Sequence, residues 1–340
     1  MSDSKSKVTI QDIAAHASVS ISTVSRVLRG SAGVSDSKQQ AVLQAVEALD
    51  YRPNAFARSL ASGESMTIGV LTQNFGSPFY DAILGGVMLA LEATPYTPIF
   101  ADGRWHASAE RRALQLFDDR RVDGIVVVGG RLAEEELQQV AGRTPLIVVG
   151  RELLQMRDRC IYVDNYQAGY RAARYLLDMG HREIAYISAR MPYLETVSDV
   201  LQRYRGYEQA LRDAGIEPDP QLVVEGDLQR QSGLLAVEML LLRGRTFSAI
   251  CAANDQMVSG ARLALFRRGI RVPDDVSLVG FDDESAAAFM IPPLTTVHQP
   301  AAEMGQAAAA AILGLLDGET PAVQVMQGEL VIRESVARRR

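Results

Sequence analysis

The 340-residue sequence has few of the residues that build metal and redox centres. It has two cysteines, Cys160 and Cys251, which lie beside apolar runs typical of strands and lack the spacing of a metal site. Its four histidines are scattered along the chain and form no ligand cluster. These scarcities argue against a metalloenzyme, and we expect both cysteines to be buried as small apolar residues.

Long apolar runs and cofactor motifs are missing as well. No run approaches the roughly 20 apolar residues that a membrane helix needs. The polar start "MSDSKSK" is followed by no apolar segment, so we expect a cytoplasmic protein without a membrane partner. The first predicted strand is not followed by G-x-G-x-x-G, and the sequence contains neither a P-loop nor a G-x-S-x-G elbow. We therefore predict that the protein is not an enzyme and carries no cofactor.

The charge of the chain is divided unequally along its length. The whole sequence has 35 Lys and Arg against 41 Asp and Glu, a net charge of −6 that by itself disfavours nucleic acid. Residues 1–62 nevertheless hold seven basic and five acidic residues, which gives +2 and leaves −8 for the remainder. We call residues 1–62 the head and the remaining residues the body. A basic head joined to an acidic body permits nucleic-acid binding by the head alone.

The body alternates short apolar runs with segments of helical periodicity. The runs lie at 66–71, 97–102, 124–130, 145–150, 161–165, 183–188, 221–227, 248–255 and 277–283. Such alternation predicts parallel sheets with crossover helices, and this number of strands favours two doubly wound parallel-sheet subdomains. Several runs end in polar residues, which either cap the next helix or line a polar cleft at the carboxyl edge of the sheets. These residues are Asp102, Arg151, Asp164, Asn254, Asp255, Asp282 and Asp283.

The head has the pattern of three short helices. Thr9 and Asp12 resemble a capping box, which predicts a first helix over about 10–16. Ser20 is a natural cap for a second helix, and the short link from Ala17 to Ser20 fits a helix-turn-helix. A third helix is expected to begin after Ser35 and to end before 51–53.

The second helix has an exposed face that suits DNA. Its inward residues are apolar, whereas Ile21, Ser22, Ser25 and Arg26 face outward. Short hydroxyl side chains allow a helix to approach the major groove closely, and Arg can bond guanine in a bidentate manner. The alternative is an ordinary solvated helix in an unrelated bundle.

Motifs in both parts of the chain resemble one protein family. The head contributes "VTIQDIAAHASVSISTVSRVLRG" and "ALDYRPNAFARSLAS"; the body contributes "RVDGIVVVGG", "MGHREIAYIS", "RYRGYEQAL", "ANDQMVSGA", "VPDDVSLVGFDD" and "PPLTTVHQP". Together these motifs, in this order over residues 8–335, resemble the LacI/GalR family of bacterial transcriptional regulators. One departure is Ser18, at a turn where many members have Gly. If this residue has positive φ, Ser costs about 1 kcal/mol relative to Gly.

The resemblance implies a helix-turn-helix domain over 1–53, followed by a hinge helix and linker over 54–65. Two hinge segments of a homodimer would fold together in the minor groove, where Leu60 acts as an apolar wedge. Operator DNA would be contacted by Thr9, Ser20, Ile21, Ser22, Thr23, Ser25, Arg26, Asn54, Ala57 and Leu60. The chain ends without the Leu-heptad tail of tetrameric relatives, which favours a dimer.

For residues 66–340 the resemblance implies an effector-binding and dimerisation domain similar to periplasmic sugar-binding proteins. Its N-subdomain is expected at about 66–164 and 298–322 and its C-subdomain at about 165–297 and 323–340, with crossovers near 163–165, 297–299 and 321–324. The strongest effector-binding candidates are Arg203, Asn254 and Asp282. Further candidates are Phe79, Trp105, Arg151 and Gln299. The segment 189–202 is longer than in many relatives.

The implied function is an operator-binding repressor of carbohydrate-metabolism genes that a small ligand, a sugar or sugar phosphate, controls allosterically. Two alternatives stay open. One is a sugar-binding protein without DNA function, and the other is a regulator that responds to a purine or nucleoside.

Overall fold

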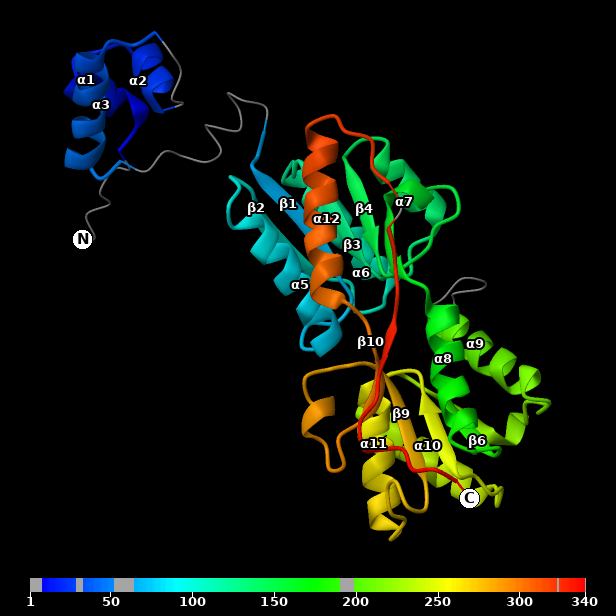
Figure 1. The fold of residues 1–340 in the computed structure, drawn as a ribbon. Helices are drawn as coiled ribbons and strands as arrows, with labels where there is room; N and C mark the ends of the chain where they lie inside the picture. Colours follow the sequence, from blue (N-terminus) through cyan, green and yellow to red (C-terminus); the bar gives the residue numbers. More distant parts are fainter. Residues whose placement is uncertain (1–7, 29–32, 52–63, 190–198, 323, 340) are drawn as a thin grey trace. The chain divides into compact units, whose positions relative to one another are not determined.

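The computed structural model describes residues 8–28, 33–51, 64–189, 199–322 and 324–339 (Figure 1). The chain divides into two compact units, Met1–Ser65 and Met66–Arg340. Among the described residues, no helix is long and apolar enough to cross a bilayer, and no group of three or more His, Cys, Asp and Glu side chains is placed to hold a metal ion.

The first unit contains three helices around a small apolar core. They are α1 (Ile10–His16), α2 (Ile21–Leu28) and α3 (Asp36–Ala48). At the start of α1 the Asp12 carboxylate accepts hydrogen bonds from the backbone N–H and the hydroxyl of Thr9, both at 2.8 Å. At the start of α2 the Ser20 hydroxyl accepts the N–H of Thr23 at 3.2 Å. The predicted caps therefore lie at the predicted helix starts. The core consists of Ile13, Ala14, Val24, Val42 and Ala45.

The link between α1 and α2 contains Ser18, at the turn position where many members of the family have Gly. Ser18 has φ of 52°, in the left-handed region that glycine adopts without steric cost. Ser18 therefore has the positive φ for which a cost relative to Gly was expected at this turn.

The second unit contains two sheets, and the first sheet with its helices is called the N-lobe. Its strands are β1 (Thr67–Thr72), β2 (Thr97–Asp102), β3 (Gly124–Val128), β4 (Leu146–Val149), β5 (Cys160–Val163) and β11 (Gln324–Met326), all parallel in the order β11-β5-β4-β3-β1-β2. Side chains alternate between faces, so Val126 and Val128 pack with α5 (Pro78–Leu91) and α12 (Ala301–Leu316). Ile125 and Val127 pack with α6 (Ala107–Asp119) and α7 (Glu134–Ala141).

The second sheet with its helices is called the C-lobe. Its strands are β6 (Ile184–Ala189), β7 (Val223–Gly226), β8 (Ala249–Ala252), β9 (Ser277–Asp282), β10 (Thr295–His298) and β12 (Glu329–Val331), in the order β12-β10-β9-β8-β6-β7. All neighbours are parallel except the edge strand β12, which is antiparallel to β10. Helix α8 (Asn165–Asp178) packs on α9 (Asp199–Asp213), and α10 (Arg230–Leu242) packs on α11 (Asp255–Arg267). Two doubly wound lobes were predicted, and the structure confirms them.

Short 3-10 turns complete the lobes at Arg157–Arg159, Pro220–Leu222 and Ala287–Phe289. Cys160 and Cys251 are free and buried in strands, as the sequence predicted.

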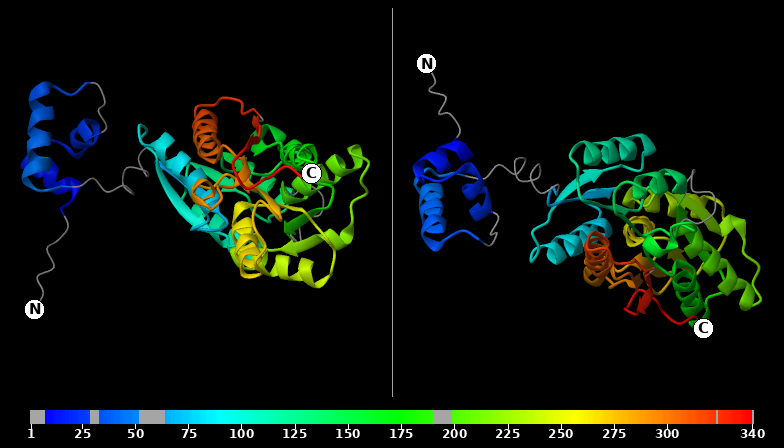
Figure 2. Two further views of the ribbon diagram at one scale, coloured as in Figure 1. Left: turned by 60° about the horizontal axis from the view of Figure 1, so that its bottom comes forward. Right: turned by 90° about the horizontal axis from the view of Figure 1, so that it is seen from above.

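Three crossovers join the lobes (Figures 1 and 2). Two of them, between Val163 and Asn165 and after His298, lie where the sequence placed them. The third was expected near 321–324, with the C-subdomain resuming at about 323, and that position is wrong. The chain first adds β11 to the N-lobe as a parallel partner of β5, and it crosses only at 327–328 before β12 begins.

Candidate functional site

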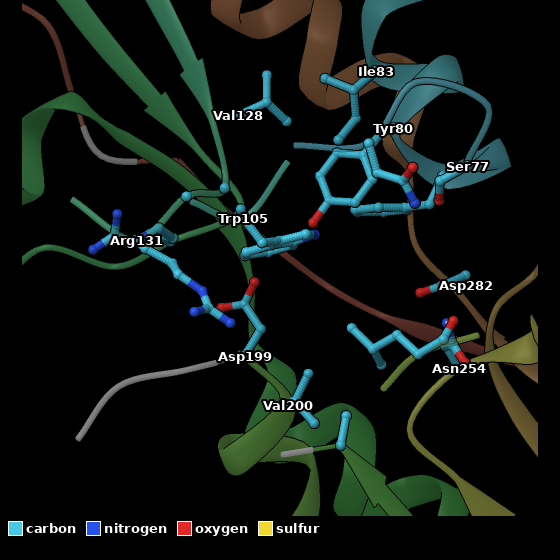
Figure 3. A pocket seen from close by; sticks show the side chains of 18 of the residues that line it. Ser77, Tyr80, Ile83, Trp105, Val128, Arg131, Asp199, Val200, Asn254 and Asp282 are labelled. Carbon is cyan, nitrogen blue, oxygen red and sulfur yellow. The ribbon is translucent and has the colours of Figure 1, made fainter. Parts of the chain in front are cut away.

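A cavity of about 460 Å³ lies between the two lobes (Figure 3). Its walls come from segments that follow β2, β3, β4, β6, β7, β8 and β9, and from the first turns of α5 and α9. Ligands of doubly wound sheets bind beyond the carboxyl ends of the strands. The cavity is therefore the place in this fold where a small ligand is expected.

Arg203, on α9, is held in the C-lobe wall of the cavity. Its Nε donates to Oδ1 of Asn165 at 2.7 Å, and its Nη1 donates to the carbonyl oxygen of Ala253 at 2.6 Å. The guanidinium carbon lies 3.8 Å from the ring centroid of Phe281. These contacts fix the plane of a guanidinium that is only 6 % exposed. A guanidinium fixed in this way is preorganised to bond a polar ligand.

Asp282 ends β9 beside Arg203. Its Oδ1 lies 3.6 Å from Nη1 of Arg203 and accepts a hydrogen bond from Nε2 of Gln299 at 2.6 Å. Burial raises the pKa of the Asp282 carboxyl to about 6, against the opposing effects of Arg203 and Gln299. Its φ of 109° is strained for a residue with a side chain, and such strain is concentrated at binding sites.

Two of the polar strand ends, Asn254 and Asp164, cap the helix that follows them, and Asn254 also lines the cavity. The Asn254 Oδ1 accepts the N–H of Met257 and its Nδ2 donates to the carbonyl of Leu228, both at 3.0 Å, so its amide is engaged although it lines the cavity. Asp164 accepts the N–H of Gln167 at the start of α8. Arg151 and Asp282, by contrast, line the cavity without capping a helix.

Three aromatic side chains form one side of the cavity. Trp105 and Tyr80 meet edge to face with ring centroids 6.0 Å apart, and Phe79 meets Tyr80 in the same way at 5.4 Å. The backbone of Trp105 has φ of 56°, and its N–H donates to Oε1 of Gln73 at 3.1 Å. Figure 3 shows Tyr80 and Trp105 together on one wall, with Asp282 and Asn254 to one side.

Six of the seven effector-binding candidates line this cavity. Gln299 does not line it; this side chain is 3 % exposed and contacts Asp282 instead. The sequence reasoning missed Tyr80, Arg131 and Asp199, which line the cavity too. Asp199 could have been found, because it precedes Arg203 by one helical turn on α9. Burial raises the pKa of the Asp199 carboxyl to about 6.

The surface of α2 has the exposure that a DNA-reading helix needs. Val24 is fully buried, whereas Ile21 is 47 % exposed and Ser22 and Arg26 are exposed. The Ser20 hydroxyl lies 2.8 Å from that of Ser22 and 2.9 Å from that of Thr23.

Not every DNA-contact candidate of the sequence lies on this exposed surface. Ser25 is partly buried, whereas Thr9 at the start of α1 is exposed and its hydroxyl donates to Asp12. Three further DNA-contact candidates, Asn54, Ala57 and Leu60, lie outside the described residues. Two residues that the sequence reasoning missed, Gln11 and Lys38, share a concave surface with Ser20, Ile21 and Thr23.

A helix-turn-helix unit in one chain with a two-lobed α/β body, whose lobes enclose a cavity lined by charged and aromatic side chains, defines the class of ligand-regulated DNA-binding proteins. Comparison with known families agrees. Residues 9–54 match the bacterial regulatory proteins of the lacI family, and residues 173–336 match a periplasmic binding protein-like domain.

Relatives of known function match nearly the whole chain. The HTH-type transcriptional regulator AscG of Escherichia coli is 34% identical over 333 residues, which cover 96% of this chain and 98% of AscG. The regulator GalR of the same organism is 34% identical over 332 residues, covering 97% and 96%. The chain belongs to the lacI family of bacterial regulatory proteins, and these relatives are transcriptional regulators rather than enzymes.

Solved structures of the family share the fold. A lac repressor dimer bound to operator and the anti-inducer ONPF superposes with a TM-score of 0.88 at 27% identity, covering 98% of this chain and 100% of that one. The complex of the transcriptional regulator CelR with cellobiose gives a TM-score of 0.72 at 32% identity, covering 96% and 99%.

Proposed function

We propose that this chain is a sequence-specific repressor of carbohydrate-metabolism genes whose operator affinity is controlled by a sugar in the cavity between the lobes. The observation that carries the proposal is the buried Arg203–Asp282 pair in the cavity wall. A guanidinium donates two bonds in one plane and a carboxylate accepts two, which suits neighbouring hydroxyl groups. The aromatic wall of Trp105 and Tyr80 suits the apolar face of a pyranose ring.

Relatives support a sugar as the effector. CelR is solved with cellobiose, and a ribose operon repressor of Haemophilus influenzae is 32% identical over 330 residues. We infer that Arg203, Asn254, Asp282, Phe79, Trp105 and Arg151 contact the ligand, and that Gln299 acts by orienting Asp282.

The mechanism couples the cavity to DNA through the two lobes. Because a ligand that contacts both walls binds one arrangement of the lobes more tightly, it shifts the population toward that arrangement. In a homodimer bound to a symmetric operator, this shift changes how well the two helix-turn-helix units fit both half-sites at once and therefore changes the operator affinity. Ile21, Ser22 and Arg26 of α2 would read bases in the major groove. Such a regulator works where the chromosome is, in the cytoplasm.

The DNA-binding part is tested by selecting duplexes from a random library with the full chain. We expect enrichment of a sequence with two-fold symmetry, and Arg26→Ala should weaken binding and relax the preference at one base pair of each half-site by about 1–3 kcal/mol. A protein that enriches no sequence is a ligand-binding protein without DNA function, and the proposal is then wrong.

A further inference from the structure

The charged residues of the cavity wall are divided unequally between the two lobes. Among the described residues that line the cavity, the N-lobe contributes the arginines Arg104, Arg131 and Arg151 and no carboxylate. The C-lobe contributes Asp199, Asp227 and Asp282 together with Arg203. In Figure 3 Arg131 and Asp282 lie on opposite sides of the cavity. The charged side chains that line the cavity are therefore basic on the N-lobe wall and mostly acidic on the C-lobe wall.

The arginine of the C-lobe is compensated within its own lobe. Arg203 bonds to Asn165 and to the carbonyl of Ala253 and lies 3.6 Å from the Asp282 carboxylate. Its charge is balanced within its own lobe, so the candidates for binding a ligand anion are the arginines of the N-lobe wall.

Arg151 is an N-lobe arginine whose guanidinium has a buried N–H donor without an acceptor among the described residues. It follows β4, and its Nη2 donates to the carbonyl oxygen of Leu132 at 3.1 Å. Its Nη1 is buried and has no hydrogen-bond partner among the described residues. A buried donor of a charged group that lacks an acceptor costs free energy, which an anionic acceptor in the cavity would restore.

The nearby carboxylates leave room for such an acceptor. Glu110 is fully buried behind the wall, and its oxygens accept the backbone N–H groups of Arg131 at 2.9 Å and Leu132 at 3.1 Å. Glu110 interacts electrostatically with Arg131 and Arg151, and Asp199 interacts with Arg151 from the opposite lobe. Neither carboxylate supplies a hydrogen-bond acceptor to the buried Nη1 of Arg151. A ligand anion at the N-lobe wall would therefore compete with Asp199 for Arg151.

We propose that Arg151 binds the carboxylate or phosphate of an acidic sugar, whose hydroxyls face Asp282 on the opposite wall, and that Arg131 adds positive charge to the same wall. This inference rests on the proposed function, because it assigns the charged group of the same effector. A bidentate guanidinium matches both anions, so the shared chemistry is a planar or tetrahedral oxyanion on a sugar.

Calorimetric titration of the full chain with matched ligands tests the inference. The probes are D-glucose and D-galactose, their aldonates and uronates, and their 6-phosphates. We expect at least one charged sugar to bind at least about tenfold more tightly than its neutral parent. Preference for the carboxylates or for the phosphates then identifies which anion the wall accepts.

Variants test whether the N-lobe wall causes the preference for charged over neutral sugars. Arg151→Gln should bring the ratio of the affinity for the charged sugar to the affinity for its neutral parent close to one. Arg151→Lys keeps the positive charge but loses the bidentate donor geometry, so it should give an intermediate ratio. Arg131→Gln provides the same test if Arg151→Gln does not fold. Asp199→Asn should raise the affinity for the charged sugar, because it removes a competitor for Arg151. The matched control is Arg112→Gln, an exposed α6 arginine outside the cavity, which should leave the ratio unchanged.

The outcomes separate the inference from the proposed function. If neutral sugars bind as tightly as charged ones, or if Arg151→Gln and Arg131→Gln both keep the preference, the anion subsite is wrong while a sugar-controlled regulator stands. If no sugar of either series binds, the proposed sugar effector fails and the inference fails with it.

Discussion

Asp282 combines three unusual properties in a single residue, namely a side chain that is only 8 % exposed, a strained φ of 109° and a carboxyl pKa raised to about 6. The protein retains a buried carboxylate here at a cost in stability. A role in ligand binding explains why such a costly residue stands in the cavity wall.

The raised pKa gives Asp282 a defined pH dependence. A sugar hydroxyl donates more strongly to an ionised carboxylate, so effector affinity should be constant above pH 7 and fall as the pH drops through about 6. We expect Asp282→Asn to bind more weakly at pH 7.5 and to lose this part of the pH dependence. Calorimetry between pH 5 and 8 measures both effects. A parent protein whose pH profile matches that of the variant would contradict the role of Asp282.

Stability should change with pH in the opposite direction. The pKa values of Asp199 and Asp282 rise from 3.8 to about 6 in the fold, so the folded protein takes up protons before the unfolded chain does. The free energy of unfolding of the ligand-free protein should therefore gain a favourable contribution as the pH falls from 7 to 5. Denaturant unfolding of the parent and of the Asp199→Asn, Asp282→Asn double variant at both pH values isolates this contribution.

Ser18 provides a separate test in the helix-turn-helix unit. Because its φ of 52° disfavours a Cβ, Ser18→Gly should stabilise this unit by about 1 kcal/mol. Amide exchange at Val24, measured in the full chain, reports the change. Ser18→Ala keeps the Cβ and is the matched control; equal protection in the two variants would mean that the φ angle carries no strain.

The helices that form the lobes pair through glycines, and one pair positions the site. A Cβ built on Gly169 of α8 would lie 2.2 Å from the carbonyl oxygen of Arg203 on α9. The reciprocal Gly206 of α9 faces the carbonyl oxygen of Tyr166 at 2.1 Å. The close approach of these backbones fixes Arg203 relative to Asn165 at the start of α8.

Gly169→Ala should therefore damage both stability and ligand binding. Because backbone must move to admit the methyl group, we expect a loss of about 1–3 kcal/mol in the free energy of unfolding and weaker effector binding. Gly85→Ala on α5, where a Cβ would meet nothing within 4 Å, is the control and should be neutral or slightly stabilising. Thermal unfolding and calorimetry of both variants measure this; equal behaviour would show that the α8–α9 contact does not position Arg203.

Helix and strand positions were largely predictable from the sequence, because each follows local periodicity and capping. The start of α2 follows from Ser20, and β2 matches its apolar run at 97–102. The third crossover was not predictable in the same way. Strand β11 is a three-residue, largely exposed edge strand without an apolar run, and only its pairing with β5 defines it.

The cavity was predictable only in part. Arg203 and Asp282 were identified through family motifs, and the structure places the Nη1 of Arg203 3.6 Å from the Oδ1 of Asp282; their contact with a ligand stays a prediction. Tyr80, Arg131 and Asp199 carry no motif. Tyr80 and Arg131 belong to the N-lobe and Asp199 to the C-lobe, and they line one cavity because the two lobes face each other. The division of charge between the walls is likewise a property of the assembled domain.

The central claim is that a ligand in the cavity changes the affinity of the chain for DNA. The most direct measurement is a titration of the selected duplex with the full chain, followed by fluorescence anisotropy, with and without a sugar that raises the melting temperature. The account predicts that this ligand changes the dissociation constant for the duplex by at least about fivefold and that Asp282→Ala abolishes the change. A ligand that binds the cavity and leaves DNA affinity within a factor of about two would contradict it.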